Sequence, residues 1–448
     1  MTRRGEVVRS SDASSPARLL LAGIAVVGTV VLSSCGGTEG RDEPQAFSVD
    51  QCARKAFSYF RQEANPVTGL VKDRATNVGP IRDYDVASIA ATGFGLVAIC
   101  IGAERGWMPH DAAYQRALNT LRFLSGDPTY PRQMPQEHGF FYHFVNPGTG
   151  RRAGDTEVSS VDTAWLLGGV LFAGEYFKGT QVEELAGRIY RRVDFAWMLN
   201  GGTTLCHGWK PEGGFLPWRW GAYSEHMLLY LLAIGSPTHG IPAECWSAWT
   251  REQGEYAPRR TFVDLPLFCH QFSHCFVDFR NRRDSLGLNY WQTSVNATII
   301  NSRFCRDQAG TYQSYRGGVW GLSACDGPTG YRAYRAPPNT ADHDGTVAPW
   351  AVCASIVFDD AIVRTGYDPA LCRNTLATIY RKHAGRIWGR YGFSDGFNVD
   401  LNWYDADVIG IDLGAGLMMI ENQRDEFVWQ RFGQLACVRR AMRACGFG

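Results

Sequence analysis

The sequence predicts an all-α fold, an (α/α)6 barrel or six-hairpin toroid in which six inner helices are surrounded by outer ones. Six segments are apolar almost all round, as a helix must be when neighbours cover each of its faces. Segments with one apolar stripe lie between them and are typical of outer helices. Alternating strand patterns are few, so we expect β structure only in loops and small hairpins, for example within 312–334. An irregular helical bundle is the alternative.

The predicted elements follow one another in a regular order. The four clear inner helices are 85–101, 159–177, 223–235 and 408–420. Two weaker ones begin near residues 268 and 345. The stretches predicted as outer helices are 111–124, 182–199, 287–306 and 368–383. Because no linker, low-complexity run or charge block interrupts residues 47–448, we interpret them as a single domain.

The N-terminal residues 1–35 have the pattern of a lipoprotein signal peptide. A basic start leads into an apolar run at 19–31, which is too short to span a bilayer as a helix. The run ends in LSSCG, so we expect Cys35 to become the lipidated N-terminus; plain signal cleavage nearby is the alternative. Residues 36–46 are predicted to form a flexible tether. We therefore expect export to the cell envelope or periplasm, with membrane contact only through the lipid.

Charge and composition exclude one class of partner and favour another. The chain carries 45 basic and 44 acidic residues, a net charge of +1, with no basic stripe that would attract nucleic acid. Aromatic residues make up 13% and include 14 tryptophans. Such a composition suits either a large aromatic core or a cleft whose rings stack on the apolar faces of sugars. We expect a monomer without a cofactor.

The cysteines indicate an oxidising compartment. Without Cys35, the 13 cysteines leave an even number, so several disulfides are predicted for an exported chain. Cys437 with Cys445 and Cys269 with Cys275 are close enough in sequence to be candidates, although connectivity cannot be deduced. Buried free thiols are the alternative. Because no cysteine or histidine cluster has zinc spacing, no metal is predicted.

Acidic residues occupy the starts of the predicted inner helices, which a barrel would bring to one common mouth. An acidic residue there can be a simple helix cap. Glu225 and Asp412, however, sit inside apolar first turns where a lone carboxylate would be costly to bury. Together with Glu157 they are the predicted catalytic residues, because glycoside hydrolysis needs one carboxylic acid and one carboxylate at the same bond. The alternative is a buried salt bridge to an arginine such as Arg219 or Arg390.

Aromatic and polar neighbours of these acids are predicted to bind sugar. The run GWKPEGGFLPWRWGAYSEHM precedes and includes Glu225, and GFFYHF lies upstream of Glu157. Packing of these rings against the barrel rim is the alternative. A helical spacing of i and i+4 could make His270 and His274 a metal face, but hydrogen-bonding roles are favoured. The residues predicted to bind substrate are Asp162, Tyr142, Trp218, Trp220, Tyr223, His270, His274, Asp326, Asp395 and Trp403.

Several motifs resemble a known family, the bacterial glycoamylase-like domain of endo-β-1,2-glucanases, which is related to a segment of cyclic β-1,2-glucan synthases. They run in order over nearly everything between residues 57 and 429. The similar stretches are GLVKDR from 69, SIAATGFGL from 88, EVSSVDTAWLLGGVLFAGEYF from 157, GFLPWRWGAYSEHMLLYLLAIGSPTH from 214, PLFCHQFSHCFVDFRNRRD from 266, GVWGLSACDGPTGYRAYRAPP from 318, DGTVAPWA from 344, WGRYGFSDGFN from 388 and IGIDLGAGLMMIEN from 409.

The resemblance implies an (α/α)6 barrel, no catalytic metal, and hydrolysis of β-1,2-glucan with inversion of configuration. It implies Glu225 as general acid, with Glu157 and Asp412 as the other family acids. The base stays open, because a substrate hydroxyl can relay the proton. The chain departs from the family in having IDLGA where many members have IDQGP, and in Cys275 and Cys325. These departures put the linkage and chain-length preference in question.

Two other functions fit the same residues. A transglycosylase would use the same acid but place an acceptor sugar where water attacks. A surface glycan-binding lipoprotein would keep the aromatic cleft without catalysis, yet it would have no need of several acids at one mouth. The sequence therefore favours a glycoside hydrolase over both.

Overall fold

The computed structural model describes residues 46–127 and 129–447. The predicted signal peptide, the lipidated Cys35 and the tether up to residue 45 lie outside the described residues. Among the residues described, each helix is too short or too polar to cross a bilayer.

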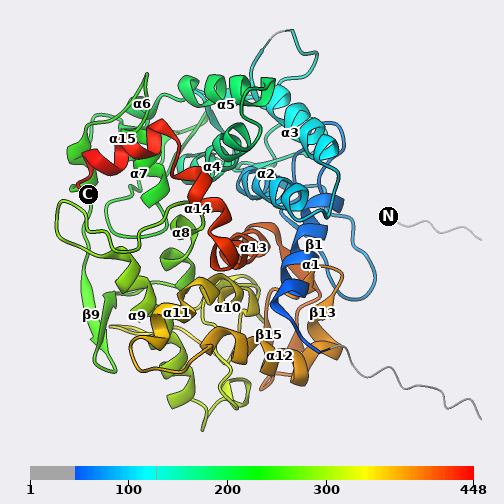
Figure 1. The fold of residues 1–448 in the computed structure, drawn as a ribbon, viewed down its shortest axis with the longest axis vertical. Coiled ribbons are helices and arrows are strands. Elements are labelled where there is room, and N and C mark those ends of the chain that lie inside the picture. Colours follow the sequence, from blue (N-terminus) through cyan, green and yellow to red (C-terminus); the bar gives the residue numbers. More distant parts are fainter. Residues whose placement is uncertain (1–45, 128, 448) are drawn as a thin grey trace, which may run out of the picture. The chain divides into compact units, whose positions relative to one another are not determined.

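In the part of the chain described, six inner helices form a ring (Figure 1). Helix α4 packs between α2 and α7, and α13 packs against α2, α8 and α10. Their residues are buried almost without exception, which explains why these segments are apolar on every face. The inner helices are α2 (Ile89–Glu104), α4 (Ser160–Tyr176), α7 (Met227–Ile234), α8 (Phe272–Phe276), α10 (Pro349–Ser355) and α13 (Gly410–Asp425).

Amphipathic helices cover the outside of this ring, each with one buried face. They are α1 (Val49–Gln62), α3 (His110–Leu124), α5 (Gln181–Arg192), α9 (Tyr290–Asp307), α12 (Leu371–Ile387) and α15 (Ala436–Ala444). Short helices connect the layers: α6 (Phe195–Leu199), α11 (Asp359–Val363), α14 (Phe427–Phe432), and the 3-10 turns η1 (Ala243–Trp246), η2 (Leu267–His270), η3 (Gln313–Tyr315) and η4 (Ile356–Phe358). The predicted (α/α)6 barrel is confirmed.

Several predicted helices begin or end elsewhere: those expected from 223, 268 and 345 begin at Met227, Phe272 and Pro349, and two others differ for clear local reasons. The outer helix expected at 182–199 is broken, because Val193 is extended and Asp194 caps α6 by accepting a hydrogen bond from the Trp197 amide at 2.9 Å. The inner helix expected from residue 85 begins at Ile89, where the Ser88 side chain accepts from the Ala91 amide. The residues before Ile89 belong to a strand instead.

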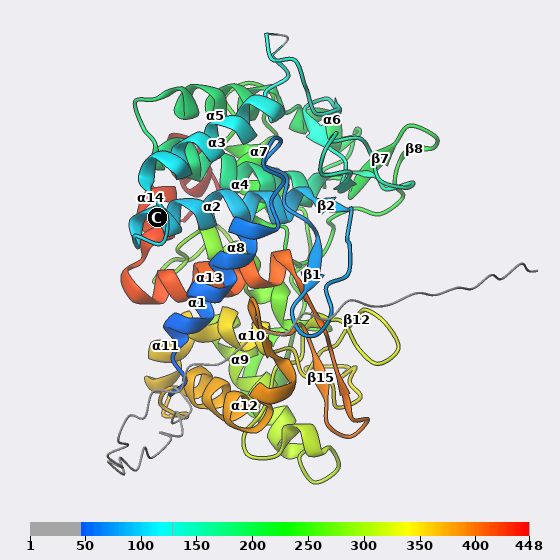
Figure 2. The ribbon, with the colours of Figure 1, turned by 90° about the vertical axis from the view of Figure 1, so that its right-hand side faces the viewer.

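The strands are short and pair at one end of the barrel, where Figure 2 shows many of them on the same side of the helices. Pairing joins distant segments, since β1 pairs with β17 and β6 with β7. The strands are β1 (Arg74–Thr76), β2 (Ala87–Ser88), β3 (Gln136–Glu137), β4 (Phe140–Phe141), β5 (Phe144–Val145), β6 (Val158–Ser159), β7 (Gly208–Lys210), β8 (Gly214–Phe215), β9 (Gln253–Tyr256), β10 (Arg259–Phe262), β11 (Ala324–Cys325), β12 (Arg332–Ala333), β13 (Trp388–Gly389), β14 (Gly392–Phe393), β15 (Phe397–Asn398), β16 (Trp403–Tyr404) and β17 (Asp407–Ile409).

The prediction of several disulfides is wrong for the described residues. Two cysteines of α15, Cys437 and Cys445, are eight residues apart, roughly 12 Å along a helix, whereas a disulfide needs Cα atoms within about 7 Å. Burial raises the pKa of core thiols such as Cys275, so these cysteines act as small apolar side chains. The free, buried cysteines are Cys52, Cys100, Cys206, Cys245, Cys269, Cys275, Cys305, Cys325, Cys353, Cys372, Cys437 and Cys445.

Helices α2 and α4 approach so closely that only glycine fits at their crossing. A Cβ atom on Gly169 would lie 1.9 Å from the carbonyl oxygen of Gly93. A Cβ atom on Gly93 would in turn lie 2.3 Å from the carbonyl oxygen of Trp165. The backbone of one inner helix therefore packs directly on the backbone of the next, which fixes their spacing.

We expect Gly169→Ala to lower the free energy of unfolding by about 1–3 kcal/mol, because the added methyl group forces the two helices apart. Chemical denaturation measures the change. The matched control is Gly385→Ala in the outer helix α12, where an added Cβ meets nothing within 4 Å. The control should keep or slightly raise stability, because alanine favours helix. Equal stability of both variants would contradict the close crossing.

Candidate active site

A cavity of about 400 Å³ lies where several inner helices begin. The first turns of α2, α4, α8 and α13 each contribute to its wall, together with the turn before α7. This common mouth was expected from the acidic helix starts. The lining residues are Asp73, Arg74, Ser88, His143, Phe144, Glu157, Ser159, Val161, Asp162, Trp165, His207, Trp220, Glu225, Phe268, Phe272, Tyr331, Ile409 and Ile411.

Glu225 lies in the turn before α7 and faces the cavity. Its carboxylate accepts a hydrogen bond from Ser224 Oγ, and Cys269 Sγ lies 3.7 Å from Oε2. Burial, with a contribution from the negative charge of Asp162, raises the pKa of the Glu225 carboxyl. A carboxyl whose pKa is raised keeps its proton at higher pH, which is the property required of a general acid.

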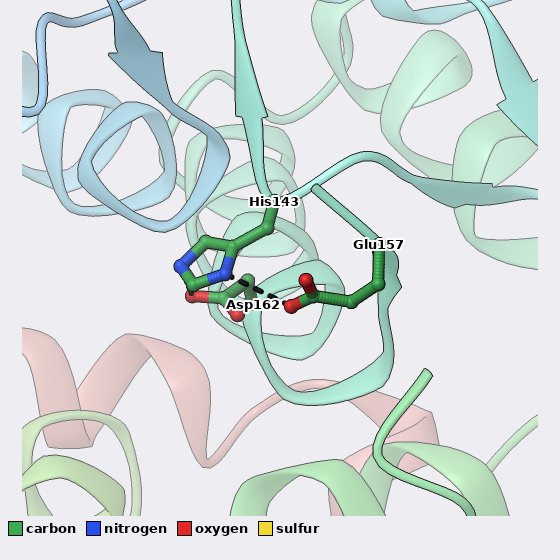
Figure 3. Close-up of side chains that lie close together, drawn as sticks. All are labelled: His143, Glu157 and Asp162. Carbon is green, nitrogen blue, oxygen red and sulfur yellow. Dashed lines mark hydrogen bonds and ion pairs between the residues drawn. The ribbon is translucent and has the colours of Figure 1, made fainter. Parts of the chain in front are cut away.

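Glu157 and Asp162 both lie close to the His143 ring (Figure 3). Nδ1 of His143 is 3.0 Å from Glu157 Oε1, and Nε2 is 3.4 Å from Asp162 Oδ1. The hydrogen bond from His143 lowers the pKa of Glu157 to about 2. Burial opposes a charge on the ring, but the carboxylates of Asp162, Glu157 and Asp73 outweigh it and raise the pKa of His143 to about 9. Glu157 is therefore ionised near neutral pH, whereas the raised pKa of Glu225 shifts that carboxyl toward its protonated form.

Asp412 is placed differently from the other two predicted acids. It is 2% exposed and lines a small neighbouring cavity against Cys52 and Trp350 instead of the larger one. Burial and the adjacent Asp395 carboxyl raise the pKa of Asp412 far above its usual range. The structure thus brings Glu157 and Glu225 to one cavity, and it holds Asp412 behind the wall.

Asp326, Asp395 and Asp405 form an acidic cluster beside Asp412. Carboxylate oxygens of the three lie within 4.8 Å of one another, a spacing at which they could hold a hard cation. The charge is partly balanced, because Arg74 Nη1 lies 2.8 Å from Asp326 Oδ2. Burial and the neighbouring Asp326 raise the pKa of Asp405 to about 7, so part of the cluster is protonated near neutral pH.

The alternative of buried salt bridges to arginine does not describe these acids. Arg219 donates to the carbonyl oxygens of Leu199 and Asn200, and Arg390 donates to those of Asn77 and Gly79. Both guanidinium groups therefore fasten loop backbone instead of pairing with Glu225 or Asp412.

The predicted aromatic residues fall into two groups. Trp220 lines the cavity, stacks on His207 with ring centroids 3.9 Å apart, and donates from Nε1 to Ser160 Oγ at 2.9 Å. Trp218 is 62% exposed, which leaves its ring free to contact a long ligand outside the cavity. The structure places Tyr142 and Trp403 in strand regions, partly buried and outside the lining set.

Tyr223, His270 and His274 are buried in the core and do not line the cavity. Tyr223 stacks on Phe262 and donates to the carbonyl oxygen of Cys269. Nε2 of His274 lies 2.9 Å from Ser294 Oγ. Burial lowers the pKa of both histidines to about 3, so they are neutral core residues that support the wall.

Known proteins share this fold. The Glycoamylase family model matches residues 217–436. An exo β-1,2-glucooligosaccharide sophorohydrolase (non-reducing end) of Parabacteroides distasonis is 27% identical over 424 residues, which are 86% of this chain and 56% of that protein. An endo-β-1,2-glucanase of Chitinophaga pinensis, solved with sophorotriose and glucose, is 27% identical with a TM-score of 0.80, over 90% of this chain and 99% of that one. The chain carries a glycoamylase-like domain.

The comparisons also set two limits. The chain spans about half the length of the curated P. distasonis relative. An endo-β-1,2-glucanase of the fungus Talaromyces funiculosus shares 13% identity with a TM-score of 0.59, over 88% of this chain and 89% of that one, and so shares only the fold with the glycoamylase-like domain.

Sequence reasoning missed part of the wall of the glycoamylase-like domain. Asp73 and Arg74 end the motif GLVKDR, yet neither was singled out, because their place at the mouth depends on β1 pairing with β17. His143 lies in GFFYHF, and its amide donates to the Glu157 carbonyl oxygen at 2.9 Å. A histidine in a run that pairs with the acidic motif is the signal that could have found it. The missed lining residues include Asp73, Arg74, His143, His207, Phe268, Phe272 and Tyr331.

We expect Asp405→Asn to stabilise the glycoamylase-like domain at pH 8 and to change it little at pH 4. The pKa of Asp405 is raised in the folded state, so the folded chain binds more protons, and wild-type stability falls as pH rises from about 4 to 7. Asparagine cannot ionise, so the variant avoids this loss of stability, which amounts to about 1–3 kcal/mol. Urea unfolding at both pH values measures it.

The matched control is Asp400→Asn in the neighbouring hairpin. Hydrogen bonds from Gln313 and Ser314 outweigh burial and lower the pKa of Asp400, the opposite direction. This variant should therefore lose stability at pH 8. A stabilised control, or an Asp405→Asn variant with no dependence on pH, would show that the acidic cluster is not strained by charge.

Proposed function

We propose that this chain is a glycoside hydrolase that cleaves β-1,2-glucan by an inverting acid/base mechanism, with Glu225 as the general acid. The observation that carries the proposal is the pairing of opposite environments in one cavity. Burial raises the pKa of Glu225, while the hydrogen bond from His143 lowers the pKa of Glu157 to about 2. Two carboxyl groups with separated pKa values are what acid/base cleavage of a glycosidic bond requires.

The reaction follows from these protonation states. Glu225 gives its proton to the glycosidic oxygen as the bond from that oxygen to the anomeric carbon breaks, and the leaving chain departs as an alcohol. Water attacks the anomeric carbon from the opposite face and gives a proton to a carboxylate base, so the configuration inverts. Residues Trp220 and Phe144 on the wall offer ring surface to the sugars.

Glu157 and Asp412 are the two candidates for the base. Glu157 faces the cavity and can accept a proton from a water held there. Asp412 lies behind the wall, so a base role would need a relay through a substrate hydroxyl or a water. Tyr331 lines the cavity. Burial and the charge of Asp412 raise the pKa of its hydroxyl, so Tyr331 lies close enough to Asp412 to feel its charge.

The relatives support the choice of substrate. The printed names of the P. distasonis and C. pinensis proteins differ in exo or endo mode, but both specify the β-1,2 linkage. The C. pinensis match extends over 99% of that chain, so the shared part includes its whole barrel. The cavity of about 400 Å³ at the helix starts has room for a few sugar residues of such a glucan.

We expect the purified protein to release reducing ends from linear β-1,2-glucan and not from β-1,3- or β-1,4-glucan. Glu225→Gln should lower kcat by about 10²- to 10⁴-fold, because glutamine cannot donate the proton. The matched control is Glu184→Gln on the outer helix α5, which is exposed and should retain wild-type turnover. Circular dichroism checks that each variant is folded.

Each failure of this experiment has a distinct meaning. Full turnover in Glu225→Gln would remove the acid assignment. Cleavage of another linkage alone would keep the mechanism and remove the substrate. Glucan binding by a folded wild-type protein that releases no reducing ends would favour a glycan-binding lipoprotein, and transfer to an added acceptor sugar would favour a transglycosylase.

We also propose export and a lipid anchor at Cys35, which rest on the sequence of residues 1–35 alone. The basic start, the apolar run and the small residues before the cysteine support the proposal. We expect the wild-type protein in the membrane fraction of its host and Cys35→Ser outside it. Equal distribution of the two proteins would contradict the anchor.

A further inference from the structure

His143 occupies a special place in the cavity wall. It lies in the short link between β4 and β5, and its ring stacks on Phe144 with centroids 3.9 Å apart and planes 17° from parallel. Figure 3 shows the ring beside the carboxylates of Glu157 and Asp162. We call His143 with these two carboxylates the His143 bridge. The stacking and the paired backbone on either side hold the ring in one orientation.

The three groups could hold a metal ion, since one atom of each lies within 4.8 Å of the others. The contacts fit a different arrangement better. Glu157 lies against Nδ1 at 3.0 Å, and Asp162 lies against Nε2 at 3.4 Å, on different edges of the ring. To bind a metal, the ring would have to point the lone pair of one nitrogen at an ion that both carboxylates also contact. Nδ1 makes a hydrogen bond with Glu157, and the carboxylate of Asp162 lies at ion-pair distance from Nε2, so a positive charge on the ring, the imidazolium form, is favoured.

We propose that His143 is a positioning residue of this site: as an imidazolium it pairs with the carboxylates of Glu157 and Asp162, and so holds Glu157 in place as an ionised proton acceptor in the same cavity as Glu225. This inference deepens the proposed function and rests on it for the catalytic consequence. The protonation state of the ring can be tested without any activity.

The charges around the ring form a connected series. Asp73 also faces His143, and it is paired in turn with Arg74, whose Nε lies 3.6 Å from Asp73 Oδ2. Three carboxylates around one ring outweigh its burial and account for the pKa of His143 being raised to about 9. Asp162 then acts on the next group, because its charge contributes to raising the pKa of Glu225.

Removal of the positive charge of His143 would therefore affect both Glu157 and Asp162. Glu157 would lose the hydrogen bond that lowers its pKa to about 2, and it would take up a proton at higher pH. Asp162 would keep the hydrogen bond from Ser159 Oγ at 2.5 Å but lose the charge opposite it. His143 acts through these neighbours and does not need to touch the reacting atoms.

The first test follows the histidine ring by NMR in the protein labelled at histidine Cε1. The signal that disappears in His143→Gln is assigned to His143, and we expect it to titrate with a pKa of about 9. In Glu157→Gln its pKa should fall by about one unit or more, because one of the opposite charges is removed. A midpoint at or below 6.5, or binding of one Zn²⁺ that depends on His143, would overturn the proposal.

The second test is the pH dependence of kcat on β-1,2-glucan. We expect His143→Gln to lower kcat by about 10- to 100-fold at pH 7. We also expect the acid limb of its profile to move up by about one pH unit or more, because Glu157 is protonated earlier. The matched control is His239→Gln, an exposed loop residue that should leave the profile unchanged. An equal loss at every pH would indicate a merely structural role and would overturn the proposal.

The two tests separate this inference from the proposed function. A wild-type protein inactive on glucan would remove the function, yet the NMR midpoint would still decide whether the ring is an imidazolium. An active enzyme with a neutral His143 at pH 7 would remove the His143 bridge and leave the function intact. If His143→Gln does not fold, Glu157→Gln provides both the assignment and the shift in midpoint.

Discussion

The inner helices are apolar on nearly every face, and most of their charged groups therefore lie toward the helix ends. Neighbouring helices cover the sides of α2, α4 and α13 completely, so a charged side chain there would be buried without a partner. The N-terminal ends differ, because their free amides and the partial positive charge of the helix favour anions. Carboxylates from distant parts of the sequence are therefore concentrated at one mouth.

Concentration of carboxylates creates an electrostatic problem that the structure solves in three ways. Glu225 is desolvated, which raises its pKa and favours the protonated form. Glu157 receives a cation in His143 and loses its proton. In the third case, Arg74 pairs with Asp326, and the neighbouring Asp405 is partly protonated near neutral pH. The same functional group thus acquires different chemistry from its surroundings, which is how one fold can place an acid beside a base.

The loops at the mouth have a role beyond connecting helices. Short strand pairs join segments far apart in sequence, such as β1 with β17 and β6 with β7, and these pairs form the wall around the carboxylates. The C. pinensis glucanase shares the barrel closely, whereas the fungal enzyme shares the fold at low identity. A barrel that tolerates such divergence leaves specificity to the side chains and loops of the mouth.

The sequence by itself determined the barrel and part of the mouth. All-round apolar runs identify buried helices because burial acts on each face of a helix separately, and a carboxylate in such a run, as at Glu225, marks a helix end open to a cavity. Local capping decided what periodicity could not, for example the break between α5 and α6. Only the tertiary structure decided that Asp412 lies behind the wall, that His270 is core, and that His143 meets Glu157 and Asp162. Those outcomes depend on which distant strands pair and on where their side chains point. A single sequence does not show either of these.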